Sequence, residues 1–323
     1  MGITPAGSFD QPFVDVVEWL HAPNATGRPN SDVMRPYFNG ADITRRPRWH
    51  WTIDFHGLTQ DAASRYEGPF DYVRRNVKPD RDNNNRPSYR ENWWLFAESR
   101  EGMRKALAPL SRFITTCRVA KHRLFTWERN PFLADSATFV FAIEDDSTFG
   151  VMHSRVHLAW AAIQGTQLRE KESGARYTPT SCFETFPFPE PTAAQRDAIA
   201  AAAYELDLLR STWLNPPEWT REEVLTFPGS VDGPWARYVT EPNAKGIGTV
   251  RYPRTVPADD AAAKKLAKRT LTNLYNERPT WLDLAHKRLD EAVFAAYGWP
   301  VDLSDDGLLA RLLALNLERA AAE

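Results

Sequence analysis

The stretch ITTCRVAKHRLFTWERNPFLADSATFVFAIEDDSTFGVMHSRVHLAWAAIQGTQL, residues 114–168, decides the fold class. Residues 114–128, 138–146 and 149–154 are rich in β-branched and aromatic side chains and are separated by turn-forming residues, which is typical of strands. From Ser154 onward apolar residues recur at helical spacing, which predicts a helix. Strands and helices that do not alternate strictly indicate an α+β fold, a mixed β-sheet with flanking helices.

Toward the N-terminus, residues 49–55 (WHWTIDF) alternate apolar and polar positions like a strand. Residues 59–75 begin with a threonine that can cap an amphipathic helix, and 91–110 also carry apolar residues at helical spacing. Residues 1–48 are rich in Pro, Gly and Asn apart from a short apolar stretch at 13–20, so they are expected to form a connector or the tail of a preceding domain.

Toward the C-terminus, residues 176–191 are extended and punctuated by prolines, and a helix is expected from Thr192 to about residue 214. Residues 215–260 form a long connection bearing Pro and Gly, and helices are expected at 261–277, 280–298 and 304–322. The expected domains are a connector at 1–48, an α+β domain at 49–191 and a helical bundle at 192–323.

Composition indicates an ordinary globular protein, with 42% hydrophobic and 25% charged residues among 323. The two cysteines, Cys117 and Cys182, have no metal-binding spacing, which favours a reducing compartment and predicts the cytoplasm. No apolar run is long enough to cross a membrane, and MGITPAGSFDQPF lacks the pattern of a signal peptide. No membrane partner is expected.

The charge is distributed unevenly along the chain. Between Arg45 and Arg129 eighteen Lys or Arg face ten Asp or Glu, a net charge of +8, whereas the whole chain carries −2. Fifteen of these cations are arginines, which suit phosphate and guanine contacts. The alternative is that these arginines form surface ion pairs and that the interleaved aromatic residues fill the core, since most charged side chains are simply solvated.

The sequence lacks residues that the catalytic motifs of a methyltransferase require. Asn215-Pro216-Pro217 is followed by Glu218, so no aromatic ring stands where an amino-methyltransferase would stack its target base, and the preceding residues form a helix pattern rather than a strand. No glycine-rich turn for a nucleotide-like cofactor is present. We therefore expect no catalytic residue and no cofactor in this chain.

Two groups of residues resemble metal sites. His153 and His157 have the i, i+4 spacing of zinc ligands but lack a glutamate base between them, and Glu144-Asp145-Asp146 is better explained as a tight turn between two strands. No metal site is expected.

Three groups of residues suit contacts with DNA. His153, Ser154 and Arg155 would lie at a helix N-terminus, whose free N–H groups favour phosphate. In a strand, alternation would place Lys121 and Arg123 on one face. A third group offers an arginine, a stacking ring and a hydroxyl: Arg176, Tyr177 and Thr178.

Taken in order, WTIDF, YEGPFDYV, VKPDR, YRENWW, VAKHRLFTW, FAIEDDSTFGVMHSRVHLAWA and RYTPTSCFETFPFP resemble the target-recognition region of MmeI-like, type IIL restriction-modification proteins and related class I adenine-N6 DNA methyltransferases. Residues 24–49 resemble the segment after the methyltransferase domain in that family, and residues 271–320 resemble its closing helical region. The resemblance implies a DNA-recognition role for residues 49–189.

In that family an upstream domain binds S-adenosylmethionine and transfers the methyl group, and its motifs are not matched here. The resemblance therefore implies two partners, double-stranded DNA and a methyltransferase domain or subunit, in a restriction-modification or related phage-defence system. The residues expected to contact DNA are Arg86, Arg90, Lys121, Arg123, His153, Ser154, Arg155, Arg176, Tyr177 and Thr178.

The sequence leaves a second function open and disfavours a third. The amphipathic C-terminal helices allow a non-catalytic scaffold subunit, or a truncated relic, that binds a partner. An autonomous nuclease is disfavoured because no cluster of acidic residues has the required arrangement.

Overall fold

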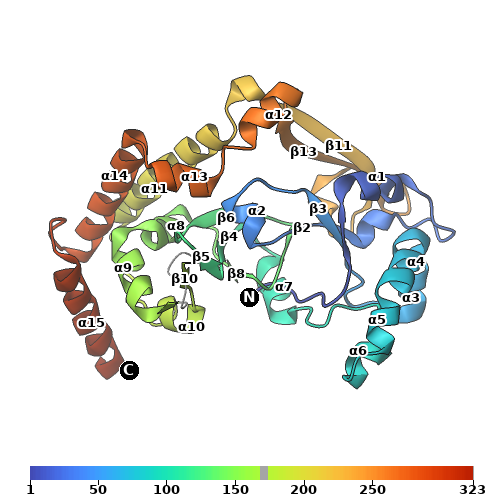
Figure 1. Cartoon of the computed structure of the whole chain (residues 1–323), viewed down its shortest axis with the longest axis horizontal. Coiled ribbons are helices and arrows are strands. Elements are labelled where there is room, and N and C mark those ends of the chain that lie inside the picture. Colours follow the sequence, from blue (N-terminus) through green and yellow to red (C-terminus); the bar gives the residue numbers. More distant parts are fainter. Residues whose placement is uncertain (168–173, 323) are drawn as a thin grey trace.

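A computed structural model describes residues 1–167 and 174–322. It confirms the α+β class: several small sheets are followed by a C-terminal helical region (Figure 1). Figure 1 places helices α3–α6 at one end of the molecule and α14–α15 at the other. The bounds of the first of these groups are α3 Gln60–Ser64, α4 Glu67–Asn76, α5 Lys78–Asp82 and α6 Pro87–Glu91. Those of the second are α14 Thr280–Tyr297 and α15 Asp305–Ala322.

The N-terminal sheet has the strand order β1-β3-β2-β7. Its strands are β1 Asp10–Pro12, β2 Met34–Phe38, β3 His50–Ile53 and β7 Leu133–Ala134, with helices α1 Phe13–His21 and α2 Gly40–Thr44 between the first three. The strand predicted at 49–55 and the helical stretch at 13–20 are thus present. Residues 1–48 nevertheless do more than connect, because β1 and β2 pair with β3 on either side.

The stretch 215–260 is also more regular than expected. It contains a long antiparallel hairpin of β11 Thr220–Ser230 and β13 Ile247–Pro257, joined on one side by β12 Val239–Thr240. Trp235 from this hairpin stacks on Trp51 of β3 with ring centroids 5.1 Å apart, and its indole N–H donates to the Met34 carbonyl at 2.9 Å. The hairpin is therefore packed against the N-terminal sheet.

The helix predicted at 59–75 forms as two helices, α3 and α4. Thr59 caps α3 as expected, since its side chain accepts a hydrogen bond from the Ala62 N–H. The helix expected at 91–110 is limited to α7 Glu101–Leu107, because Trp93 and Phe96 are buried in a non-helical stretch before it.

The middle sheet, in the order β6-β4-β8, contains β4 Arg112–Cys117, β6 Phe125–Arg129 and β8 Thr138–Phe141. A smaller sheet joins β5 Val119–Ala120, β10 Ala175–Arg176 and β9 Thr166–Gln167. Three helices pack beside them: α8 Asp146–His153, α9 Arg155–Gln164 and α10 Pro179–Cys182.

The strand predicted at 149–154 is wrong, since α8 is a helix. Asp145 is its N-cap and accepts a hydrogen bond from the Thr148 N–H at 2.7 Å, so the acidic residues begin a helix and do not form a turn between strands. Phe149 to His153 are all buried, and a short helix that is buried on every side has no apolar–polar period that distinguishes it from a strand.

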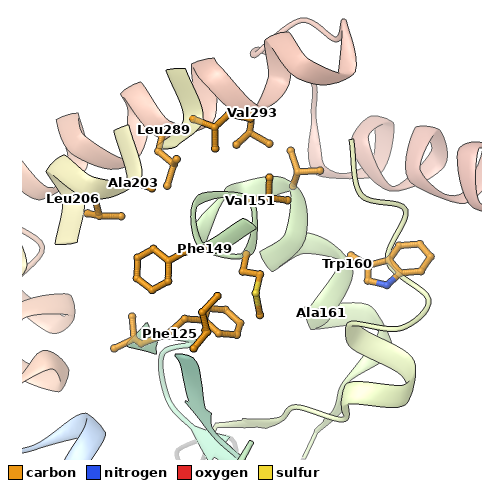
Figure 2. Packing of buried hydrophobic residues seen from close by; sticks show 14 of the residues in the cluster. Phe125, Phe149, Val151, Trp160, Ala161, Ala203, Leu206, Leu289 and Val293 are labelled. Atoms are coloured by element: carbon orange, nitrogen blue, oxygen red, sulfur yellow. The ribbon is translucent and has the colours of Figure 1, made fainter. Parts of the chain in front are cut away.

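The C-terminal region is helical as predicted. It contains α11 Ala193–Leu214, α12 Asp260–Leu266, α13 Leu271–Glu277, α14 and α15. Thr192 and Gln195 form a capping box at the start of α11, and Gly298 ends α14 with φ +67°. Figure 2 shows how α8 lies between β6 and the helices α11 and α14, with Phe125, Phe149, Leu206 and Leu289 in one continuous core.

Candidate nucleic-acid interface

A cleft of about 510 Å³ opens among the small sheet β5–β10 and helices α9, α13, α14 and α15. We call it the basic cleft, because its lining includes Lys121, His122, Arg123, Arg155, Arg176 and Arg278, against the carboxylates Asp290 and Asp305. Six of the ten residues predicted to contact DNA line it. Their individual environments decide which of them could reach a ligand.

Lys121 is exposed, and its Nζ donates to Asn276 Oδ1 at 2.7 Å. His122 Nε2 lies 2.9 Å from the same oxygen, so these two neighbours share a side. Arg123 turns inward and donates to the carbonyls of Cys117 and Ala175. The predicted pairing of Lys121 with Arg123 on one strand face is wrong, because the chain bends between β5 and β6 and residues 121–124 do not alternate.

The N-terminus of α9 is already occupied. The Arg155 N–H donates to Asp290 Oδ1 at 2.7 Å, so a carboxylate from α14 lies where a phosphate was predicted. His153 is 1% exposed and Ser154 0%, which leaves neither able to contact DNA in this conformation. Both predictions are corrected for this reason: Ser154 is the helix cap, and His153 belongs to the core.

Arg155 is half-buried and anchored. Its Nε and one terminal nitrogen donate to Asp305 Oδ1 at 3.0 and 2.7 Å, and the same terminal nitrogen donates to the Leu303 carbonyl at 2.6 Å. This guanidinium ties α9 to the segment before α15. Its role in DNA binding stays a prediction.

Tyr177 is 1% exposed, and its hydroxyl lies 3.1 Å from His157 Nε2. A stacking contact with a base is therefore excluded in this conformation, and that prediction is corrected. Arg176 and Thr178 on either side are half-buried, and Arg176 lines the basic cleft. Their contacts with DNA stay predictions.

Arg86 and Arg90 are exposed but lie on α6, at the opposite end of the molecule from α14 and α15 in Figure 1. Arg86 donates to the Tyr89 hydroxyl at 3.0 Å and Arg90 to the Asn84 carbonyl at 2.6 Å. The ten predicted residues thus do not form one continuous surface.

Many arginines of the basic window support the fold, as the alternative interpretation held. Arg81 is 2% exposed and donates to the backbone carbonyls of Pro5, Ala6 and Leu95. Arg104 forms a two-pronged ion pair with the buried Asp54, at 2.7 and 3.1 Å. The excess positive charge between residues 45 and 129 is therefore partly structural.

The structure adds two residues that the sequence did not indicate, His122 and Arg278. Arg278 is exposed, ends α13 with φ +43° and forms an ion pair with Asp283. Asn276, which joins Lys121 and His122 to α13, lies 155 residues from Lys121 in the chain. A local sequence pattern cannot reveal a cleft that is assembled across such a separation.

A buried polar network centred on Arg210 underlies the basic cleft. Arg210 is 2% exposed and donates to Asp207 Oδ1 at 2.9 Å and to the Phe125 carbonyl at 3.0 Å. It also donates to His153 Nε2 at 2.8 Å, as does the Phe125 N–H at 3.2 Å. Because Nε2 accepts from these donors, the proton of His153 is on Nδ1, which donates to the Phe149 carbonyl at 3.2 Å.

The histidines in this region are held neutral. Burial lowers the pKa of His157 to about 4 and that of His286 to about 3, and burial together with the nearby Arg210 charge lowers the pKa of His153 well below its usual value. His157 donates from Nδ1 to the Met152 carbonyl at 2.9 Å, which leaves Nε2 to accept from the Tyr177 hydroxyl. All three rings serve packing and hydrogen bonding.

We expect the stability contributed by His157 to be present above pH 6.5 and to be lost as the pH falls toward 4. The unfolded imidazole takes up a proton in this range and the folded one does not, so the loss is about 1.4 kcal/mol per pH unit, or about 3 kcal/mol in all. Urea unfolding of the wild type and of His157→Gln from pH 7.5 to 4.0 measures it. The two stability curves should converge as the pH falls, and parallel curves would show that His157 is not held neutral.

The fold defined here combines a sheet-based α+β unit with a helical region. A structure of the type IIL restriction-modification enzyme MmeI in complex with DNA has the same fold: the TM-score is 0.67 at 17% sequence identity, covering 99% of this chain and 35% of that chain. No family model and no curated protein matches the sequence. The expected similarity to type IIL proteins is thus confirmed at the level of the fold, and this chain corresponds to about a third of that enzyme's length.

In residues 1–167 and 174–322, no cluster of three His, Cys, Asp or Glu has the arrangement of a metal site. None of the helices in this described part of the chain is both long and apolar enough to cross a bilayer. Cys117 and Cys182 are buried free thiols.

Proposed function

We propose that this chain recognises a short DNA sequence and positions the duplex for adenine-N6 methylation, carried out with S-adenosylmethionine by a methyltransferase domain or subunit. The observation that carries the proposal is the likeness, along 99% of the chain, to an enzyme whose structure was determined with DNA. The basic cleft supports it independently, because several cations there converge on one concave surface.

Within the basic cleft, Lys121, His122 and Arg278 are the best candidates for phosphate contacts. Lys121 and Arg278 are exposed, and each is held by a single partner at its tip, Asn276 or Asp283, that a phosphate oxygen could replace. Arg123 has the opposite character, since three groups of the protein backbone and side chains bind its guanidinium. We assign Arg123 to holding the cleft in shape.

Duplex binding should weaken steeply with salt, with a slope of about −0.9 in log affinity against log salt for each phosphate contacted. The double variant Lys121→Gln, Arg278→Gln should bind more weakly and reduce the slope by about 2, roughly one for each cation. Fluorescence anisotropy of a labelled duplex between low and physiological salt measures both quantities.

The matched control is Lys264→Gln, Lys268→Gln, which removes two exposed cations at α12, outside the basic cleft. This control should keep the wild-type slope. Binding that does not depend on salt, or equal effects of the two double variants, would remove the basic cleft from the interface.

A scaffold role is the second candidate, favoured by large apolar side chains exposed on the C-terminal helices. Tyr204 and Leu208 of α11 are 59% and 51% exposed, and Leu313 and Leu317 of α15 are 52% and 60% exposed. Assaying adenine methylation by a co-expressed methyltransferase polypeptide, with and without this chain, separates the two roles. Methylation that requires the chain supports recognition, and co-purification without any effect on methylation supports a scaffold.

A further inference from the structure

A second cleft, of about 460 Å³, lies where the N-terminal sheet, β6 of the middle sheet, α11 and the β11–β13 hairpin meet. We call it the junction cleft; its lining includes Tyr37, Asp42, Trp49, Glu128, Arg129 and Tyr252. Clefts of this size between structural units commonly hold small ligands. The function proposed above makes no use of it.

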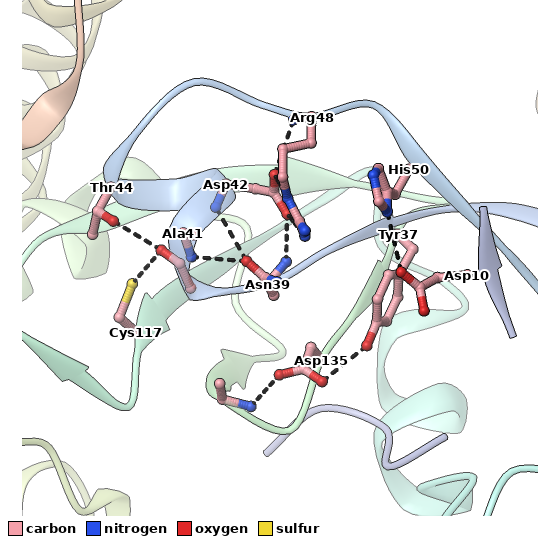
Figure 3. Close-up of polar contacts among 12 residues, drawn as sticks. Asp10, Tyr37, Asn39, Ala41, Asp42, Thr44, Arg48, His50, Cys117 and Asp135 are labelled. Carbon is pink, nitrogen blue, oxygen red and sulfur yellow. Dashed lines mark hydrogen bonds and ion pairs between the residues drawn. The ribbon is translucent and has the colours of Figure 1, made fainter. Parts of the chain in front are cut away.

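One wall of the junction cleft is fixed by internal polar contacts, shown in Figure 3. Asn39 caps α2 through the Ala41 and Asp42 N–H groups, and Asp42 in turn binds the Arg48 guanidinium at 2.9 Å. Tyr37 donates to Asp135 at 2.9 Å, and His50 Nδ1 lies 3.1 Å from Asp10. Each of these groups is hydrogen-bonded or ion-paired to another group of the protein, which makes the wall rigid.

Most cations of the junction cleft also bind partners within the protein. Arg46 donates to the Leu214 carbonyl and to Asn215 Oδ1, each at 2.9 Å, and Arg210 pairs with Asp207. Arg254 pairs with Glu223 at 3.1 Å. Arg45 and Arg129 differ: both are exposed, and the described part of the chain holds no ion pair to either. The lining also includes the exposed carboxylate Glu222.

Glu128 stands out among the acids of the cleft. It lies in β6 opposite Phe113, and the described part of the chain offers its carboxyl no hydrogen bond or ion pair. Burial raises its pKa to about 8, the nearby Asp42 charge adds to the rise, and Arg129 opposes it. At neutral pH the carboxyl is therefore mostly protonated, and it presents one donor and one acceptor side by side.

Trp49 supplies an aromatic ring at the same cleft. It is half-buried, with the Arg254 guanidinium 5.6 Å from the ring centroid. Its backbone has φ +55°, a left-handed conformation that is disfavoured for a bulky side chain and is found preferentially at functional sites. A flat ligand could stack beside this ring.

We propose that the junction cleft binds one nucleotide whose base has an amino group beside an unprotonated ring nitrogen on its Watson–Crick edge, adenine or cytosine. That edge meets the Glu128 carboxyl, the ring lies beside Trp49, and the phosphate meets Arg45 and Arg129. Adenine and cytosine each offer a ring nitrogen acceptor next to an amino donor, which matches an acid's O–H and C=O. On that Watson–Crick edge guanine and uracil carry a protonated ring nitrogen and a carbonyl oxygen, so they offer no ring-nitrogen acceptor to the acid O–H. A free nucleotide and a nucleotide unstacked from DNA present the same groups.

The first test is titration calorimetry of the full chain at pH 7 with AMP, CMP, GMP and UMP. AMP and CMP should bind about tenfold more tightly than GMP and UMP. Adenosine should bind more weakly than AMP. Arg129→Ala should reduce that difference, and the double variant Arg45→Ala, Arg129→Ala should remove it. Equal binding of all four nucleotides, or no binding of any nucleotide in free or DNA-borne form, would overturn the proposal.

Two substitutions distinguish the hydrogen bonding of the Glu128 side chain from the effect of its size. Glu128→Gln keeps a donor beside an acceptor, so AMP affinity should persist and stay constant with pH, whereas the wild type should lose affinity as the pH rises past about 8. Glu128→Ala should bind AMP about tenfold more weakly. If Glu128→Ala does not fold, the pH dependence of AMP affinity in the wild type and in Glu128→Gln still tests the proposal. Identical pH dependence in the two proteins would refute the role of Glu128.

A duplex with 2-aminopurine at an unpaired position distinguishes the two sources of the nucleotide. Fluorescence that rises on binding, and does not rise with Glu128→Ala, identifies a nucleotide unstacked from DNA. Binding of AMP without this rise identifies a free nucleotide. Because the mononucleotide titrations use no duplex, their result is independent of salt-dependent duplex binding by the basic cleft.

Discussion

Replacing Arg210 by methionine is expected to lower the free energy of unfolding by about 3–5 kcal/mol. Methionine has nearly the same length but cannot donate hydrogen bonds. The Phe125 carbonyl would lose this donor, His153 Nε2 would keep only the Phe125 N–H, and Asp207, which is 31% exposed, would lose its ion-pair partner. Arg210 is 2% exposed, so water reaches the Phe125 carbonyl and His153 only if the core opens. Urea unfolding followed by far-UV circular dichroism measures the loss.

Arg196→Met is the matched control for this prediction. Arg196 lies on the same helix, α11, and is exposed, so its replacement should change stability by less than about 0.5 kcal/mol. A second readout is specific to the network: without the guanidinium charge, the pKa of His153 and of His286 should rise, which NMR titration detects. Equal stability of the two variants would show that Arg210 does not organise the core.

Local patterns in the sequence predicted those elements whose start or period is determined by neighbouring residues. Thr59 and Thr192 can be predicted as helix caps because the cap and its N–H partner lie within three residues. Strands β1 and β2 and the β11–β13 hairpin were missed. Pro36 lies within β2, and prolines also lie within the hairpin strands at positions 228 and 253, so the local pattern favours loops there.

The candidate site was predicted less well, because a binding surface depends on burial, which is a long-range property. The sequence shows the basic groups. It does not show that Asp290, from a helix more than a hundred residues away, occupies the N-terminus of α9. Likewise, the sequence around Tyr177 predicts an exposed stacking ring, but in the folded protein this ring is buried against Phe125. Lys121 is the predicted contact whose exposure in the basic cleft agrees with its proposed role.

The second large effect is expected at Gly150 of α8, which lies against side chains of α11 and α14. A Cβ at this position would lie 2.8 Å from Ile199 Cγ2 and 3.0 Å from both Ala203 Cβ and Leu289 Cδ1. Ala203 Cβ is fixed by the backbone of α11, and Ile199 Cγ2 can move only through χ1, which is restricted for a β-branched side chain in a helix, so the helices must separate. Gly150→Ala should therefore lower the free energy of unfolding by about 1–3 kcal/mol, and Gly150→Leu by more.

Gly102→Ala provides the opposite expectation. Gly102 lies in α7 with no atom within 4 Å of an added Cβ, so alanine should raise stability by about 0.5–1 kcal/mol through its better helix propensity. Thermal and urea unfolding of both variants checks the difference in sign. Stabilisation by alanine at both positions would mean that the three helices do not meet at Gly150. Stability changes of opposite sign in the two variants would show that the close contact of α8 with α11 and α14 limits side-chain size at Gly150. The same contact holds His153 of α8 against Arg210 of α11, next to the basic cleft.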